Sequence, residues 1–151
     1  MIETGTNLEV TGIRVIKYVP DYAYYGGPAG NDLLLFRYAD VALMVAEAKQ
    51  RSGDAPGALT IVNALRTARG AALLTTMPLV NTANVDDPGT LLAERGRELY
   101  WESVRRTDLV RFGVYTKPWG LKPTDDAKYL VFPVPAQALA ANPNLKQTPG
   151  Y

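Results

Sequence analysis

The chain has 151 residues, of which 47% are hydrophobic, and its 16 Lys and Arg nearly balance its 15 Asp and Glu. This length allows one domain with a substantial core, and the balanced charge gives no reason to expect nucleic acid as a partner. The sequence contains neither Cys nor His. Disulfides, thiolate chemistry and imidazole metal ligands or proton shuttles are therefore excluded, and we predict no metal site and no cofactor.

Residues 1–31 are predicted to be an irregular lead-in that contains one or two short strands. Near its end, Tyr22, Tyr24 and Tyr25 stand beside the glycines of "YYGGPAGND". Gly and Pro at this density are typical of an exposed loop.

A pair of helices is predicted over residues 32–70. Asn31 or Asp32 is a suitable N-cap for a first helix that carries apolar residues on nearly all sides. Gly53 then suits the left-handed position after this helix, and Pro56 suits the first turn of the next one. Two helices joined by a short turn resemble a tetratricopeptide unit, which must pack against further helices because it cannot bury its own faces.

One long charged helix is predicted over residues 87–113. Its glutamates Glu94, Glu98 and Glu102 follow one another at four-residue spacing. They therefore lie on one face and repel each other unless cations from elsewhere intervene. The charged stripe of the first helix, which includes Arg37, is a candidate source of those cations.

Residues 129–151 are predicted to form an extended C-terminal strap. Pro133 and Pro135 exclude a central strand, and the ending "NPNLKQTPGY" contains prolines that restrict its backbone. We expect the strap to lie back over the helices, with Leu145 and Tyr151 as apolar anchors.

Five motifs occur in the order, and with roughly the spacing, found in one known family. They are "NDLLLFRYADVALMVAEA", "GDAPGALTIVNALRTARG", "LLAERGRELYWESVRRTDLVRFG", "YLVFPVP" and "NPNLKQTPGY". Over residues 12–151 the chain resembles the C-terminal half of SusD/RagB-type proteins. The resemblance implies an all-α, mainly helical fold with tetratricopeptide-like helix pairs, irregular loops and minor short strands.

Members of that family are exported lipoproteins of the Bacteroidota outer membrane. They bind glycans, or in some members peptides, at the cell surface and work with a SusC-like, TonB-dependent transporter. The resemblance therefore implies a nutrient-binding role without catalysis. It also implies that this chain is the C-terminal scaffold portion and lacks the signal peptide and the lipidated Cys of longer members.

Aromatic side chains are the natural candidates for glycan contacts, because their faces stack on sugar rings. The candidates here are Trp119 and the three tyrosines Tyr22, Tyr24 and Tyr25. The alternative for each is an aromatic side chain that packs on the scaffold.

The charged residues within the motifs resemble the scaffold of the family. We expect them to form a partly buried charge network between the helices, in which the loss of one partner costs ~3 to 5 kcal/mol. The expected members are Arg37, Glu47, Glu94, Arg97, Glu98, Glu102, Arg105, Asp108 and Arg111.

Two other functions fit parts of the sequence. The first alternative is a tetratricopeptide-like protein-interaction scaffold with no ligand site of its own. A glycoside hydrolase is a third interpretation, with Glu98 and Glu102 as the paired carboxylates. The several arginines nearby disfavour it, because they favour two ionised carboxylates over one with a raised pKa.

Overall fold

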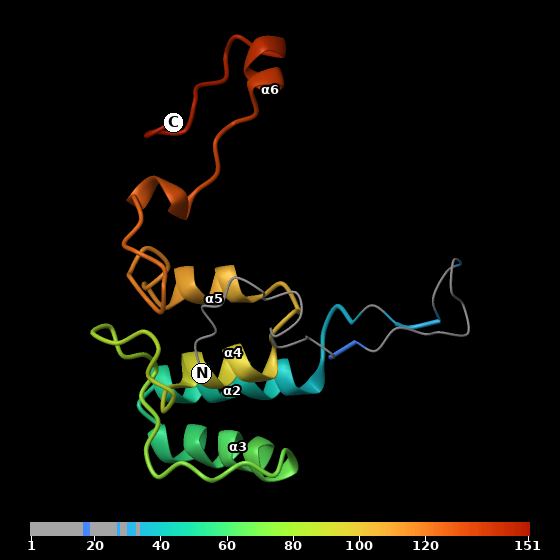
Figure 1. Ribbon diagram of the computed structural model, residues 1–151, viewed down its shortest axis with the longest axis vertical. Coiled ribbons are helices and arrows are strands. Elements are labelled where there is room, and N and C mark those ends of the chain that lie inside the picture. The colour runs from blue at the N-terminus through green and yellow to red at the C-terminus, as the bar shows by residue number, and fades with distance from the viewer. Residues whose placement is uncertain (1–16, 19–26, 28–29, 33) are drawn as a thin grey trace, which may run out of the picture. The chain divides into compact units, whose positions relative to one another are not determined.

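The computed structural model describes residues 17–18, 27, 30–32 and 34–151 (Figure 1). These residues contain five α-helices and one 3-10 helix, and their only β pairing is an isolated bridge between Trp119 and Lys122. The prediction of a mainly helical fold is confirmed. The helices belong to one unit, Phe36–Tyr151. The tyrosine cluster lies outside the described residues, as do nearly all residues of the predicted lead-in strands.

The first two described helices, α2 (Tyr38–Arg51) and α3 (Ala55–Ala68), form the predicted pair and run in opposite directions (Figure 1). The turn between them follows the sequence pattern. Gly53 has a left-handed φ of 91°, and the carboxylate of Asp54 caps α3 by accepting the N–H of Gly57. The start of α2 differs from the prediction, because this helix begins at Tyr38 instead of following a cap at Asn31 or Asp32.

A single long helix over residues 87–113 was predicted, and the structure has two. They are α4 (Leu91–Glu98), capped by the hydroxyl of Thr90, and α5 (Arg105–Arg111). In a continuous helix the carbonyl of Glu98 would accept the N–H of Glu102. Instead, the guanidinium of Arg37 donates to the Glu98 carbonyl at 2.7 Å, and the N–H of Glu102 turns to the Leu99 carbonyl.

The backbone between α4 and α5 takes an uncommon conformation. Trp101 and Ser103 both have left-handed φ values, 62° and 61°, which are rare for residues other than glycine. A hydrogen bond from Arg37, sixty-one positions earlier in the sequence, therefore ends a helix that the local sequence would continue.

The core lies where α2 packs against α3 and α4, and α4 packs against α5. The small residues Ala46 and Ala58 are fully buried on the first two helices, which lets these helices approach closely. The long connection over residues 71–90 is ordered, since Met77 and Val85 join this core. The other buried core members are Leu43, Val62, Leu91, Leu92, Leu99, Leu109, Phe112 and Val114.

Beyond the core, the chain continues through a 3-10 helix (Ala127–Leu130) and α6 (Ala136–Ala141), in which no residue is buried. The last residues return to the segment just before α6. The hydroxyl of Tyr151 donates to the carbonyls of Val131 and Lys128, and Gln147 pairs through its amide with the backbone of Val134.

The expectation that the strap lies over the helices, anchored by Leu145 and Tyr151, is therefore corrected. Both side chains are 42% exposed, and the hydrogen bonds of residues 147–151 go to residues 128–134 and within the strap itself. The amide of Gln147 and the hydroxyls of Thr148 and Tyr151 bond to backbone groups of residues 128–134, so polar bonds hold the strap where apolar anchors were predicted.

Candidate functional site

A chain of ion pairs centred on the buried side chains of Arg95 and Asp108 runs between the helices. Arg95 on α4 is 2% exposed and donates to Asp108 on α5 at 2.8 Å and to Asp40 on α2 at 3.0 Å. Asp108 also accepts from Arg111, which pairs with Glu47 on α2 at 2.8 and 2.9 Å. This chain of alternating charges ties three helices together with every member compensated.

Glu47 shows how strongly this environment favours ionised carboxylates. Burial alone would raise the pKa of Glu47, but hydrogen bonds from Arg111 and Arg51 outweigh it and lower the pKa below its usual value. The ring of Phe112 lies beneath the guanidinium groups of both arginines, at 5.1 and 5.4 Å from its centre.

A second group of ion pairs lies at the junction between α4 and α5. The guanidinium of Arg37 holds Glu98 at 2.7 Å and Glu102 at 2.9 Å, and Arg69, the C-cap of α3, donates to Glu98 at 2.8 Å. Hydrogen bonds from Arg69, opposed by burial and assisted by Arg37, lower the pKa of Glu98 to about 2. A glycosidase acid needs a carboxyl with a raised pKa, so Glu98 is unsuited to that role.

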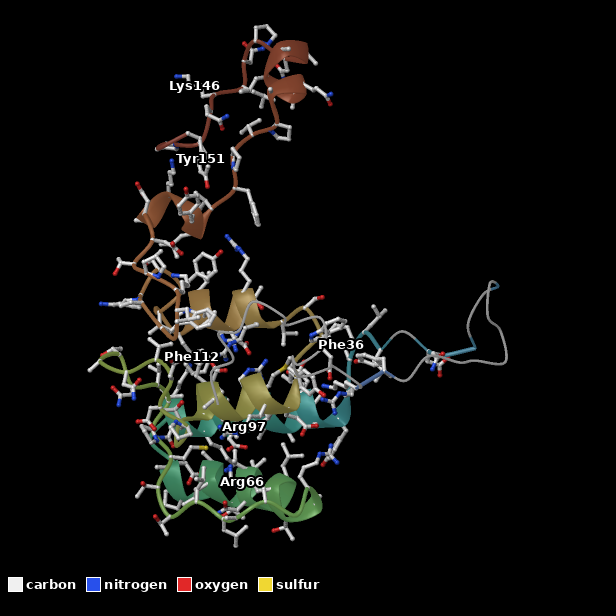
Figure 2. All side chains as sticks on the ribbon, in the orientation of Figure 1. Phe36, Arg66, Arg97, Phe112, Lys146 and Tyr151 are labelled. Carbon is white, nitrogen blue, oxygen red and sulfur yellow. The ribbon has the colours of Figure 1, made fainter. Side chains whose placement is uncertain are left out.

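A third group joins α3 to α4. Glu94 accepts from Arg66 and from Arg97, and Figure 2 shows these two arginines on neighbouring helices. Arg105 differs from the other predicted members. Its guanidinium donates to the carbonyl of Leu92 at 2.8 Å, and it forms no ion pair within the described part of the chain.

Three arginines that complete these groups were not singled out from the sequence. Arg95 sits on the predicted charged helix, one position after Glu94, and the helical pattern gave it no partner. Arg66 and Arg69 lie near the end of α3, where basic residues commonly face the helix dipole. The excess of glutamates on α4 was the one available signal that further cations had to approach from elsewhere.

Trp119 is the one candidate aromatic residue that the structure describes. It is 38% exposed, on a turn closed by two backbone hydrogen bonds with Lys122. The N–H of Gly120 donates to the carboxylate of Asp86 at 2.6 Å, which fixes this turn against the connection before α4.

More exposed apolar side chains lie elsewhere. Trp101, in the junction between α4 and α5, is 70% exposed. Tyr38, Val41, Met44 and Val45 form an exposed apolar face on α2. In the part of the chain that the structure describes, no helix has the length and apolar character needed to cross a bilayer.

An antiparallel helix pair, extended by two further helices and joined to them by buried ion pairs, defines a tetratricopeptide-like helical scaffold. Comparison with known proteins agrees with the resemblance seen in the sequence. The model of the SusD family matches residues 2–129, and the chain belongs to this family.

Two curated relatives are each 32% identical to this chain. The starch-binding protein SusD of Bacteroides thetaiotaomicron matches over 156 aligned residues, covering 93% of this chain and 26% of that protein. The SusD-like protein P38 of Formosa agariphila matches over 125 residues, covering 80% of this chain and 25% of that protein. The chain thus spans about a quarter of the length of either relative.

A solved structure shows a similar fold. The crystal structure of a SusD-like protein from Bacteroides fragilis superposes with a TM-score of 0.61 at 25% sequence identity. The match covers 79% of this chain and 26% of that one.

Proposed function

We propose that this chain forms part of the glycan-binding component of a SusC/SusD-type uptake system at the bacterial outer membrane. The observation that carries the proposal is membership of the SusD family over residues 2–129, together with a relative at 32% identity named as a starch-binding protein. In this proposal the partner is a SusC-like, TonB-dependent transporter, and the glycan is bound and released without covalent change.

The structure suits such a role in its electrostatics. Glu98 and Glu47 have lowered pKa values and are held by arginines, so these carboxylates serve the scaffold and not proton transfer. Glycan contacts fall to exposed aromatic faces. We retain Trp119 as a proposed contact because it is exposed on a turn with fixed backbone hydrogen bonds. Tyr22, Tyr24 and Tyr25 remain proposed contacts on the sequence alone.

Titration calorimetry of the 151-residue chain against a panel of oligosaccharides and peptides tests the proposal. Heat of binding with an oligosaccharide, reduced in Trp119→Ala, is the expected result. The control is Tyr129→Ala, which removes a similarly exposed aromatic ring from the 3-10 helix. Binding of peptides with no response to any oligosaccharide would contradict glycan recognition.

One observation favours the second candidate function, a protein-interaction scaffold. The apolar face of α2 is exposed over two turns, and Tyr38 at its start is 87% exposed. An apolar face of this kind marks surfaces that contact other protein segments. If the chain binds no glycan but Tyr38→Ser with Met44→Ser abolishes binding to the transporter, the scaffold function is the correct one.

A further inference from the structure

A cavity of about 450 Å³ lies between α4, the start of α5 and the connection that precedes α4, and members of the ion pairs described above form part of its lining. Its volume is within the range of small-molecule sites, ~300–1,000 Å³. It combines charged and aromatic side chains, which include Asp86, Arg95, Arg97, Tyr100, Trp101 and Arg105.

Arg105 is the cation in this cavity that the protein leaves without a carboxylate. Arg97 pairs with Glu94, and Arg95 pairs with two aspartates. No carboxylate among the described residues lies within ion-pair distance of Arg105, since Asp108 is taken by Arg95 and Arg111. Burial lowers the pKa of Arg105, and the charges of Asp108 and Asp86 oppose this shift.

The position of the Arg105 guanidinium is fixed by its surroundings. It lies across α4 at Gly96 and donates to the Leu92 carbonyl. A Cβ at Gly96 would approach the Nη1 atom of Arg105 to 2.9 Å, so the absence of a side chain there makes room for the guanidinium. One N–H of this group is used by the backbone, and the others remain for an acceptor.

Arg95 also belongs to the lining of this cavity. It is 2% exposed, and its Nε and Nη2 atoms are used by Asp108 and Asp40. Its Nη1 atom is buried without a hydrogen-bond partner. A buried donor without an acceptor carries a free-energy cost.

Aromatic side chains stand beside these cations. Trp101 and Tyr100 both line the cavity and are 70% and 42% exposed. Trp101 holds its exposed position in the left-handed backbone conformation, with a φ of 62°. Exposed aromatic faces stack on the apolar surfaces of sugar rings. An acidic peptide would be bound by the cations without using these aromatic faces, so the aromatic side chains favour a sugar as the ligand.

We propose that this cavity is a subsite for a negatively charged sugar unit, whose carboxylate or sulfate group is bound by Arg105 while its ring lies against Trp101 or Tyr100. The proposal rests on the proposed glycan-binding function and names the class of glycan. A guanidinium binds a carboxylate or a sulfate through paired N–H donors. Carboxylated and sulfated sugars would therefore be recognised in the same way.

Titration calorimetry at low and moderate salt separates the possibilities. The probes are a trigalacturonate, a sulfated galactose trisaccharide, a neutral galactose trisaccharide and triglutamate. We expect at least one charged sugar to bind at least about tenfold more tightly than the neutral one. Added salt should weaken its binding. The two charged sugars show which anionic group the subsite prefers.

Variants locate the effect. Arg105→Gln should remove the preference for the charged sugar, and Trp101→Ala should weaken binding of every sugar. Lys146→Gln is the control, because it removes one positive charge from an exposed residue outside the cavity. Each variant is checked by a thermal melt. If Arg105→Gln does not fold, Gly96→Ala, which displaces the guanidinium, replaces it.

Equal affinity for charged and neutral sugars, or an unchanged preference in Arg105→Gln, overturns the subsite and leaves the glycan-binding function intact. Silence with all three sugars overturns the subsite, whether or not triglutamate binds, and the oligosaccharide panel described above then decides the glycan-binding function.

Discussion

The helical region, residues 38–114, and the C-terminal region, residues 127–151, are held together by different forces. The first buries an apolar core and a chain of ion pairs that includes Arg95 and Asp108. The second has no residue classed as buried and is held by hydrogen bonds between its own segments. Burial makes each interaction in the first region costly to remove, whereas water can take the place of most hydrogen-bond partners in the second.

One side chain joins the two regions. Arg106 on α5 stacks over the ring of Phe132 at 4.3 Å and over that of Tyr115 at 4.8 Å, and it donates to the Tyr129 carbonyl at 2.7 Å. The link is a cation held between aromatic rings and not an apolar interface, so the regions are expected to lose structure independently.

Removal of a buried charge should have the largest effect. Asp108→Ala takes one of its two carboxylates from Arg95, which is 2% exposed, so we expect a loss of ~3 to 5 kcal/mol in the free energy of unfolding. Urea unfolding followed by circular dichroism measures it. Asp126→Ala, in the exposed 3-10 helix cap, is the matched control and should stay close to the wild type. Equal stability of the two variants would contradict the contrast.

A pair of leucine substitutions compares packing in the helical and C-terminal regions without changing any charge. Leu43→Ala opens a cavity at a fully buried position on α2 and should cost ~2 to 5 kcal/mol. Leu145→Ala removes the same atoms from a half-exposed position in the C-terminal region and should cost less than about 1 kcal/mol. The two urea midpoints provide the comparison. A larger loss from Leu145→Ala would show that the C-terminal region is the better packed one.

Acid should weaken the helical region before it affects the other. Glu98 has a pKa of about 2 in the folded protein against an ordinary value of 4.5, so the unfolded chain binds more protons between these values. The contribution of ionised Glu98 to the free energy of unfolding is therefore complete above about pH 5 and is lost as the pH drops toward 2. Glu47, whose pKa is also lowered, acts in the same direction.

Urea titrations from pH 7 to pH 3 measure this decline. Glu98→Gln cannot lose a proton at that position, so its stability at pH 7 should be lower and its dependence on pH shallower. A wild-type protein with constant stability between pH 5 and pH 3 would show that these ion pairs contribute nothing to folding.

The smallest effect is expected from shortening the chain. Deletion of residues 142–151 removes hydrogen bonds that go to residues 128–134, so the melting temperature of the helical region should change by less than about 5 °C. Residues 127–135 should become more susceptible to proteases in the same variant. A loss of more than about 10 °C would mean that the strap stabilises the helices, as the sequence alone had suggested.

The sequence by itself determined the local elements whose signals lie within a few residues. The turn at Gly53 and Asp54 and the start of α3 follow from glycine, capping and proline chemistry that needs no distant partner. The order of the motifs also determined the family, because several weak patterns in register are specific together.

The tertiary structure alone decided where the charged helix breaks and which charges pair. Arg37 takes the carbonyl of Glu98 across sixty-one positions of sequence, and Arg95 finds Asp40 across fifty-five. Helical periodicity indicates which face of a helix a residue occupies, but not which side chains from other elements approach that face. The sequence pattern therefore predicted one continuous helix and did not identify Arg95 as a partner of two aspartates. It likewise gave no sign that Arg105 would line a cavity without a carboxylate partner, because that depends on which cations the folded chain leaves unpaired.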